Sequence, residues 1–252
     1  MNYGSESLTV IVPFYNEEST LEKSVQNLIE ENVASCIILV DDFSSDNSYY
    51  IAENLVKQNP EIILLKKEKN EGKGSAVYFA KPYVLTSHVI VHDADLEYSP
   101  SDISKLFEIS KINPSSLLIG TRTIKGVSRK KIYKTLAFIN KMLTYLFNIL
   151  NFSRVSDIAT CYMLMPSKFF INNIGEEKKF CIEVEILSKF IKTKNPIIEI
   201  PIQYNGRKYS EGKKIKFIDG ISILIKIFQY SKLFNLFSDL RNYKFETKSE
   251  GK

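Results

Sequence analysis

Short runs of apolar, largely β-branched residues alternate with amphipathic segments through the first half of the chain. Five of these runs predict strands, at residues 8–12, 36–40, 61–65, 88–91 and 117–119. The runs are almost continuously apolar, which is typical of parallel strands with both faces covered. Helix-length segments between them predict βαβ units, so we expect an α/β fold with a mostly parallel sheet flanked by helices.

The clearest helix follows the first strand. Leu21, Val25 and Leu28 recur at the spacing of one helical face. Ser19 and Glu22 have the spacing of a capping box, which predicts where this helix begins.

The second half of the chain is less regular. Residues 129–150 predict a long helix, 183–191 another, and 215–237 a strongly apolar one. Residues 197–203 predict a late strand, which Pro201 places at a sheet edge. We expect one domain over residues 1–238, with a C-terminal helical extension, and a polar, disordered tail over 239–252.

Composition narrows the class of protein. The 252 residues are 44% hydrophobic and 25% charged, with a net charge of +5 and no dense basic block. This balance favours anionic partners such as phosphates or acidic lipid and gives no sign of nucleic-acid binding. The three cysteines are far apart and form no CxxC pair, as in reduced cytoplasmic proteins. With neither a secretory signal nor an apolar run of about 18 residues, we expect a cytoplasmic protein, with peripheral contact to the membrane face.

Polar residues follow every predicted strand. Ligands of open parallel sheets bind beyond the carboxyl ends of the strands, so these residues are expected to converge. The five segments are Pro13-Phe14-Tyr15-Asn16-Glu17, Asp41-Asp42, Asn70-Glu71-Gly72-Lys73-Gly74, Asp93-Ala94-Asp95 and Gly120-Thr121-Arg122.

Asp93 and Asp95 are the strongest candidates for chemistry. Residues two apart in an extended segment point the same way, and two carboxylates so placed repel unless a cation compensates. Oxygen ligands of this kind select Mg²⁺ or Mn²⁺, which also bind substrate phosphates. Glu97 is two residues further on and is a candidate third ligand. A solvated turn would show the same pattern, but the other polar strand ends favour a metal.

Three further strand-end residues suit a nucleotide. Asp42 has a carboxylate that accepts hydrogen bonds from a base or ribose. Lys73 lies between two glycines at a helix start, a position suited to an anion. The forked donors of Arg122 match phosphate oxygens. His88 and His92 are interpreted as strand residues without a catalytic role.

The motifs also occur in a familiar order. The segments VIVPFYNEE, VDDFSSD, NEGKGSA, DADLE and GTR are followed by DIATCY from Asp157, FCIEVE from Phe180 and GRKYSEGKKI from Gly206. Over residues 8–230 this set resembles the family 2 inverting glycosyltransferases typified by dolichol-phosphate mannosyltransferase. The resemblance implies a GT-A fold that binds a nucleotide-diphosphate sugar.

The resemblance also implies roles for individual residues. Pro13, Tyr15, Glu17 and Asp42 would hold the nucleoside, with Lys73 and Ala94 also in the donor site. Asp93 and Asp95 would link the metal to the diphosphate, with Glu97 nearby, where the dolichol-phosphate enzymes usually have Gln. Arg122, Arg207 and Lys213 would neutralise the departing diphosphate.

The absence of tryptophan excludes the Gln-x-x-Arg-Trp motif of processive synthases, so a single transfer is expected. The expected acceptor is a polyprenyl phosphate, whose anionic oxygen needs no strong base. A sugar hydroxyl, as in glycan, cell-wall or surface polysaccharide synthesis, stays open as an alternative. It would need a general base, for which Asp157, Glu183 and Glu185 are candidates.

Two other interpretations concern the apolar helix and the class of protein. Ile221, Leu224, Ile225, Phe228 and Phe234 give residues 215–237 a wide apolar surface, suited to a membrane interface or to packing on the sheet. A non-catalytic protein that binds a nucleotide sugar remains a second alternative. Sugar-phosphate nucleotidylyltransferases are disfavoured, because Pro13–Glu17 replaces their glycine- and arginine-containing loop.

Overall fold

The structure is a computed structural model, and it describes residues 6–123, 129–130, 134–179, 181–207 and 217–234. A seven-stranded sheet runs through its centre in the order β3-β2-β1-β4-β7-β5-β8. All neighbouring strands are parallel except β7, which is antiparallel to both β4 and β5. The chain reverses its direction of winding between β1 and β4, and such a switch point is where open α/β sheets bind ligands.

The strands of the main sheet are short and mostly buried. Their bounds are β1 Leu8–Phe14, β2 Cys36–Asp41, β3 Ile62–Lys66, β4 His88–Val91, β5 Leu117–Thr121, β7 Met163–Pro166 and β8 Ile197–Pro201. A separate two-stranded pair joins β6, Arg129–Lys130, to β9, Tyr204–Asn205.

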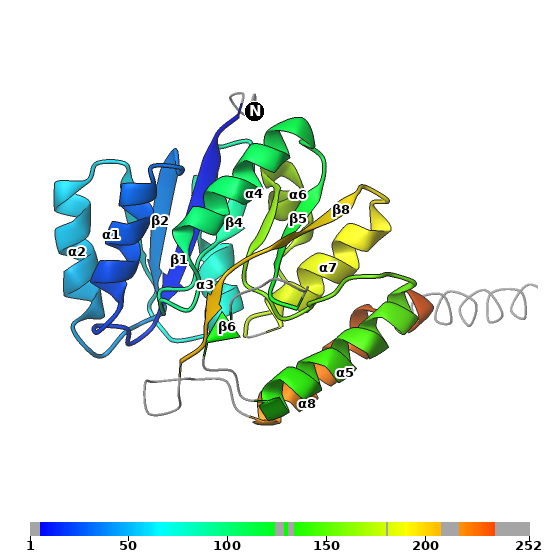
Figure 1. Cartoon of the computed structure of the whole chain (residues 1–252). Helices are drawn as coiled ribbons and strands as arrows, with labels where there is room; N and C mark the ends of the chain where they lie inside the picture. The colour runs from blue at the N-terminus through cyan, green and yellow to red at the C-terminus, as the bar shows by residue number, and fades with distance from the viewer. Residues whose placement is uncertain (1–5, 124–128, 131–133, 180, 208–216, 235–252) are drawn as a thin grey trace, which may run out of the picture.

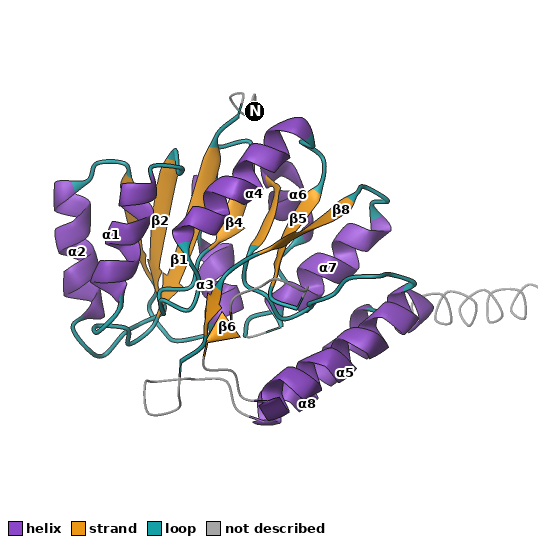
Figure 2. Cartoon of the chain, in the orientation of Figure 1, coloured by secondary structure: helices purple, strands orange, loops and turns teal. Residues whose placement is uncertain are grey.

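Helices cover the sheet (Figures 1 and 2). Helix α1 contacts both α2 and α4, while α3 packs against β1 and β2. Their bounds are α1 Leu21–Glu31, α2 Ser48–Gln58, α3 Lys73–Phe79, the 3-10 helix η1 Lys81–Tyr83, α4 Pro100–Ile112, α5 Lys134–Asn151, α6 Ser167–Asn173, α7 Ile182–Lys192 and α8 Phe217–Tyr230.

Helices α5 and α8 pack against each other at one end of the molecule, and α8 also contacts α7 (Figure 1). Phe147 and Ile227 are fully buried there. In the described part of the chain, no helix combines the length and apolar character that crossing a membrane requires.

The α/β architecture and the five early strands are confirmed, as is the position of the late strand β8 at the sheet edge. The capping box is wrong: the N-cap of α1 is Thr20, and no side chain caps this helix end. The long helix begins at Lys134 and not at residue 129, because Arg129–Lys130 pairs with Tyr204–Asn205 as a strand. The tail 239–252 lies outside the described residues, and the domain boundary stays a prediction.

Candidate active site

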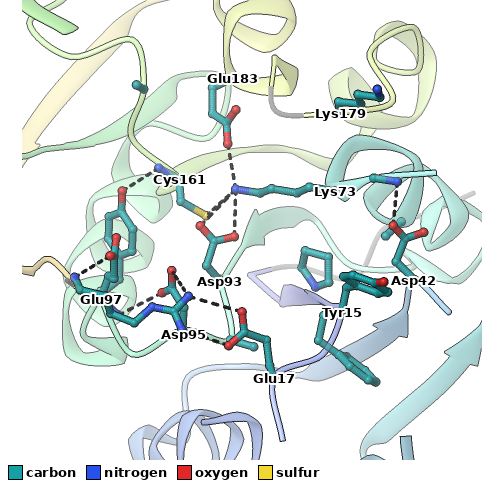
Figure 3. A pocket seen from close by; sticks show the side chains of 18 of the residues that line it. Tyr15, Glu17, Asp42, Lys73, Asp93, Asp95, Glu97, Cys161, Lys179 and Glu183 are labelled. Carbon is teal, nitrogen blue, oxygen red and sulfur yellow. Dashed lines mark hydrogen bonds and ion pairs between the residues drawn. The ribbon is translucent and has the colours of Figure 1, made fainter. Parts of the chain in front are cut away.

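A cavity of about 660 Å³ opens beyond the carboxyl ends of β1 and β4. Its lining includes most of the strand-end residues expected to converge, from Pro13 and Tyr15 after β1 to Asp93 and Asp95 after β4 (Figure 3). The size suits a bound small molecule. The fold therefore gathers residues that are far apart in the sequence, such as Glu17 and Arg207, which are 190 positions apart.

Lys73 joins two carboxylates in the cavity. Its ammonium lies 2.9 Å from Oδ1 of Asp93 and 2.9 Å from Oε1 of Glu183, and 3.6 Å from the sulfur of Cys161. Burial opposes ionisation of Asp93, but the charge and hydrogen bond of Lys73 outweigh it and hold the pKa of Asp93 below its usual value. Asp93 is therefore an anion.

Arg207 joins the other pair of carboxylates. Its guanidinium donates from NH1 to Glu17 at 3.1 Å and from NH2 to Asp95 at 3.3 Å. Its Nε is buried and has no hydrogen-bond partner among the described residues. The guanidinium thus keeps a donor for a further oxygen.

Glu97 forms structural hydrogen bonds beside Arg207. Its Oε2 accepts a hydrogen bond of 2.6 Å from the Tyr204 hydroxyl, and its Oε1 accepts one of 2.7 Å from the Arg207 amide. Within the described ranges, no three acidic, histidine or cysteine side chains are grouped as a metal site would require. Glu97 anchors the segment that carries Arg207, and its part as a third metal ligand stays a prediction.

The charge balance around Asp95 fits a divalent cation. Burial, followed by the charges of Asp93 and Glu97, raises the pKa of Asp95 to about 7, although Arg207 opposes this shift. Negative charge is therefore in excess at the Asp93–Asp95 turn even with Lys73 and Arg207 in place. Two hard carboxylates with such an excess are a suitable donor set for Mg²⁺ or Mn²⁺.

Asp157, a candidate base, lies in an ion pair outside the cavity lining. It is fully buried, and it is absent from the cavity lining. Arg122 donates to both of its oxygens, from Nε at 2.8 Å and from NH2 at 2.9 Å, and Asn140 donates to Oδ1 at 3.0 Å. Burial would raise the pKa of Asp157, but Arg122 reverses the effect and lowers it. These contacts suit Asp157 to positioning Arg122, which does line the cavity, and its part as a general base stays a prediction.

The side chains of the other two candidate bases, Glu183 and Glu185, point in different directions. Glu183 lines the cavity, whereas Glu185 is absent from the lining and turns toward residues 175–177. Both lie in the first turn of α7. Neighbouring positions two apart on a helix face different directions, so the helix sends one carboxylate to the cavity and the other away from it.

Asp42 organises the loop that precedes α3. Its Oδ1 accepts from Lys67 at 2.6 Å and from the Glu71 amide at 3.2 Å, and its Oδ2 accepts from the Gly72 amide at 2.7 Å. Asp42 still lines the cavity beside Tyr15. It can therefore contact a nucleoside, but part of its hydrogen-bonding capacity already holds the loop.

The backbone around Lys73 differs from the sequence prediction. The amides of Gly74 and Ser75 donate to the carbonyls of Lys179 and Lys178, at 3.2 and 2.9 Å, so they are not available to an anion. The cation at this helix start is the Lys73 side chain. Lys213 lies outside the described residues.

Sequence reasoning missed several residues of the cavity. Tyr98, Lys179 and Tyr204 line it, and Lys67 forms an ion pair of 2.6 Å with Asp42. None of them belongs to a recognisable motif spacing. Lys67 directly follows β3, so its position after a strand could have marked it as a candidate like the other strand-end residues.

His92 is buried between Ser24 and Tyr162, and His88 contacts Ser87 and Pro114, which agrees with structural roles for both.

A mostly parallel sheet, with paired aspartates and three cations at its switch point, defines the architecture of nucleotide-sugar glycosyltransferases with the GT-A fold. The fold matches that of glucosyl-3-phosphoglycerate synthase from Mycobacterium tuberculosis, with a TM-score of 0.69 at 13% identity, covering 89% of this chain and 78% of that one. That enzyme was crystallised with Mn²⁺, UDP and phosphoglyceric acid.

Residues 9–173 match Glycosyl transferase family 2, and the chain belongs to that family. It is 28% identical over 238 residues to a UDP-N-acetylglucosamine–dolichyl-phosphate N-acetylglucosaminyltransferase of Methanococcus voltae, covering 86% of this chain and 93% of the relative. It is 25% identical to the dolichyl-phosphate β-glucosyltransferase ALG5D of Trichomonas vaginalis, over 91% of this chain and 74% of the relative.

Proposed function

We propose that this chain is an inverting glycosyltransferase that moves one sugar from a nucleotide-diphosphate sugar to a polyprenyl phosphate. The observation that carries the proposal is the cavity in which Asp93 and Asp95 meet Lys73, Arg122 and Arg207. Alternating anions and cations of this kind suit a metal-bound diphosphate. Relatives that act on dolichyl phosphate support the choice of acceptor.

The donor would lie along the cavity. Its nucleoside would contact Pro13, Tyr15 and Asp42, and the diphosphate would extend toward Asp93 and Asp95. Ala94, which is 3% exposed, keeps the turn between the two aspartates compact. The crystallised UDP of the structural neighbour favours a uridine donor, with a guanosine donor as the other outcome.

Asp93 and Asp95 would hold Mg²⁺ or Mn²⁺, with Glu97 beside them. When bound, the metal neutralises charge on the leaving diphosphate. Nε of Arg207 has no partner within the described part of the chain and can donate to a phosphate oxygen, and Arg122 is held in place by Asp157. Such preorganised cations stabilise the charge that develops as the bond to the sugar breaks.

The carboxylates favour an acceptor that is already anionic. Asp157 is saturated by Arg122 and Asn140, and Glu183 is paired with Lys73. A polyprenyl phosphate can attack the anomeric carbon without giving up a proton, so it needs no free base. For a hydroxyl acceptor, Glu183 is the carboxylate of choice because it alone of the three candidates lines the cavity.

Helices α5 and α8 would bring the protein to the lipid surface that carries this acceptor. Phe138, Met142, Tyr145 and Ile149 recur along α5 as one exposed stripe, and Ile221, Ile225 and Phe228 recur along α8 in the same way. Exposed apolar side chains that are grouped along one helix face are typical of interaction surfaces. We therefore propose that the protein is peripheral to a membrane, on the cytoplasmic face as the sequence predicts.

The test is a screen of UDP- and GDP-sugars with Mn²⁺ or Mg²⁺, with and without polyprenyl phosphate. Asp95→Asn is compared with Asp46→Asn, a carboxylate beyond β2 that does not line the cavity. We expect lipid-stimulated, metal-dependent turnover of one donor, lost in Asp95→Asn and kept in Asp46→Asn. Turnover without stimulation by lipid would select a hydroxyl acceptor. Donor binding without any turnover would select a non-catalytic binding protein.

A further inference from the structure

The loop formed by residues 174–179, between α6 and α7, lies directly against the start of α3. Two backbone hydrogen bonds join them, from Gly74 to Lys179 and from Ser75 to Lys178. A Cβ on Gly74 would overlap the Glu177 carbonyl, and one on Gly72 would lie 2.8 Å from the Lys178 carbonyl. Glycine is required here because two backbones touch, so the position of the loop and the position of α3 are linked.

One buried carboxylate holds this loop. Glu185 is fully buried, and its oxygens accept hydrogen bonds from the amides of Gly175, Glu176 and Glu177, at 2.8, 3.0 and 2.9 Å. Tyr78 donates to it at 2.6 Å and Lys189 at 2.9 Å. Because Tyr78 belongs to α3 itself, Glu185 joins both sides of the contact.

The loop is also tied down from outside. The Tyr230 hydroxyl of α8 lies 3.0 Å from Oε2 of Glu176 and 2.8 Å from Oε1 of Glu177, so that its one proton is shared between them or given to either, and Lys226 forms an ion pair of 2.7 Å with Glu177. These contacts fix the outer surface of the loop, while Glu185 fixes its inner surface.

Two cations of the cavity depend on this arrangement. Lys73 directly precedes Gly74, and its ammonium contacts Asp93 and Glu183. Lys179 is in the loop and also lines the cavity (Figure 3). A loop that moved would carry Lys179 with it and would release the turn that aims Lys73.

We propose that Glu185 is a positioning residue for the donor nucleotide, acting through loop 174–179 on Lys73 and Lys179. The inference rests on the proposed donor site and adds a group that does not touch the donor. Glutamine keeps the size of Glu185 but turns one acceptor into a donor, which cannot accept from the amides or from Tyr78. The loop would then lose part of its anchor while the cavity keeps all of its own side chains.

The experiment measures UDP and GDP binding in the presence of Mn²⁺ by calorimetry, for the full chain and for Glu185→Gln. We expect the affinity for the preferred nucleotide to fall about tenfold, the loss typical of replacing a residue that holds a ligand-binding group in place. In turnover assays the KM for the donor rises and kcat at saturating donor is retained, because Glu185 touches no reacting atom. Amide exchange should accelerate at Gly74 and Ser75 and stay unchanged in α1.

A second pair of variants tests the same contact without touching the buried charge. Gly74→Ala forces the loop away from α3 and should weaken nucleotide binding as Glu185→Gln does. Gly220→Ala is the matched control, because a Cβ there meets only Ile139 at an ordinary 3.8 Å. It should bind nucleotide as the unmodified chain does.

The outcomes separate the two proposals. If the unmodified chain binds neither nucleotide, the donor site fails, and with it this inference. If it binds and both Glu185→Gln and Gly74→Ala bind equally well, the donor site stands and the positioning role is overturned. Faster exchange throughout α1 and α4 in Glu185→Gln, with normal binding in Gly74→Ala, would likewise overturn it and leave Glu185 as a general stability determinant.

Discussion

Arg122 and Asp157 form a two-pronged ion pair, with Nε 2.8 Å from Oδ2 and NH2 2.9 Å from Oδ1. The Asp157 side chain is fully buried and that of Arg122 is 16% exposed. The guanidinium also lies 4.9 Å from the centre of the Tyr204 ring. Three contacts thus fix a cation at the edge of the cavity, in the orientation that an arginine needs to meet a phosphate oxygen.

Asp157→Asn should lower the free energy of unfolding by about 3 kcal/mol, because it leaves Arg122 without its partner charge. Denaturant unfolding measures this loss. The variant should also lower turnover, and the pH dependence of the remaining activity should keep its shape. Loss of a pH-rate limb in Asp157→Asn would instead identify Asp157 as a general base and contradict the positioning role.

Glu97→Gln separates the two roles of Glu97: if it only anchors the Arg207 segment, Mn²⁺ affinity should be nearly unchanged, because the amide oxygen can still accept from Tyr204 or the Arg207 amide. Isothermal titration of Mn²⁺ with bound nucleotide measures this. If Glu97 were a metal ligand, its replacement would weaken Mn²⁺ binding by roughly tenfold or more. Asp93→Asn serves as the comparison in which a large loss is expected.

The exposed stripe of α5 should be needed for lipid binding and not for folding. Phe138 and Tyr145 are each 65% exposed, so the double variant Phe138→Gln, Tyr145→Gln should change the free energy of unfolding by less than about 1 kcal/mol. Flotation with anionic vesicles should show binding by the unmodified chain and its loss in the variant. Equal flotation of both proteins would argue against this surface.

His88 should make stability fall in mild acid. Burial lowers its pKa, and the hydrogen bond to the Pro114 carbonyl opposes this only in part. Because the folded pKa lies below the unfolded value of 6.5, the unfolded chain binds the proton more readily. The contribution is therefore present above pH 6.5 and is lost as pH falls toward the folded pKa. Unfolding of His88→Gln as a function of pH should show a shallower acid slope than the unmodified chain.

Much of the site could be predicted because its residues follow strands. Asp42, Asp93 and Arg122 each come within two residues of the end of a strand, and parallel strands bring their carboxyl ends to one edge. Glu185 is the opposite case, because the structure turns this candidate base away from the cavity. Its spacing from Glu183 suggests a shared site, but the direction of each side chain depends on how α7 rotates against the sheet.

The antiparallel strand β7 could not be predicted in the same way. Met163–Pro166 has only four residues and is preceded by the irregular segment around Asp157, so no period distinguishes it from buried loop or helix. It nevertheless separates β4 from β5, and its neighbours Cys161 and Tyr162 pack against the Asp93 side of the cavity.

The sequence by itself determined the α/β architecture, the edge of the sheet at which ligands bind and the identity of most charged groups there. These follow from apolar periodicity and from which residues end each strand, both of which are local. The tertiary structure alone decided which charges pair. These pairs are Lys73 with Glu183, Arg207 with Glu17, and Glu185 with loop 174–179. Each joins segments whose distance and orientation depend on how whole helices pack against the sheet. Burial then shifts the pKa of groups such as Asp95.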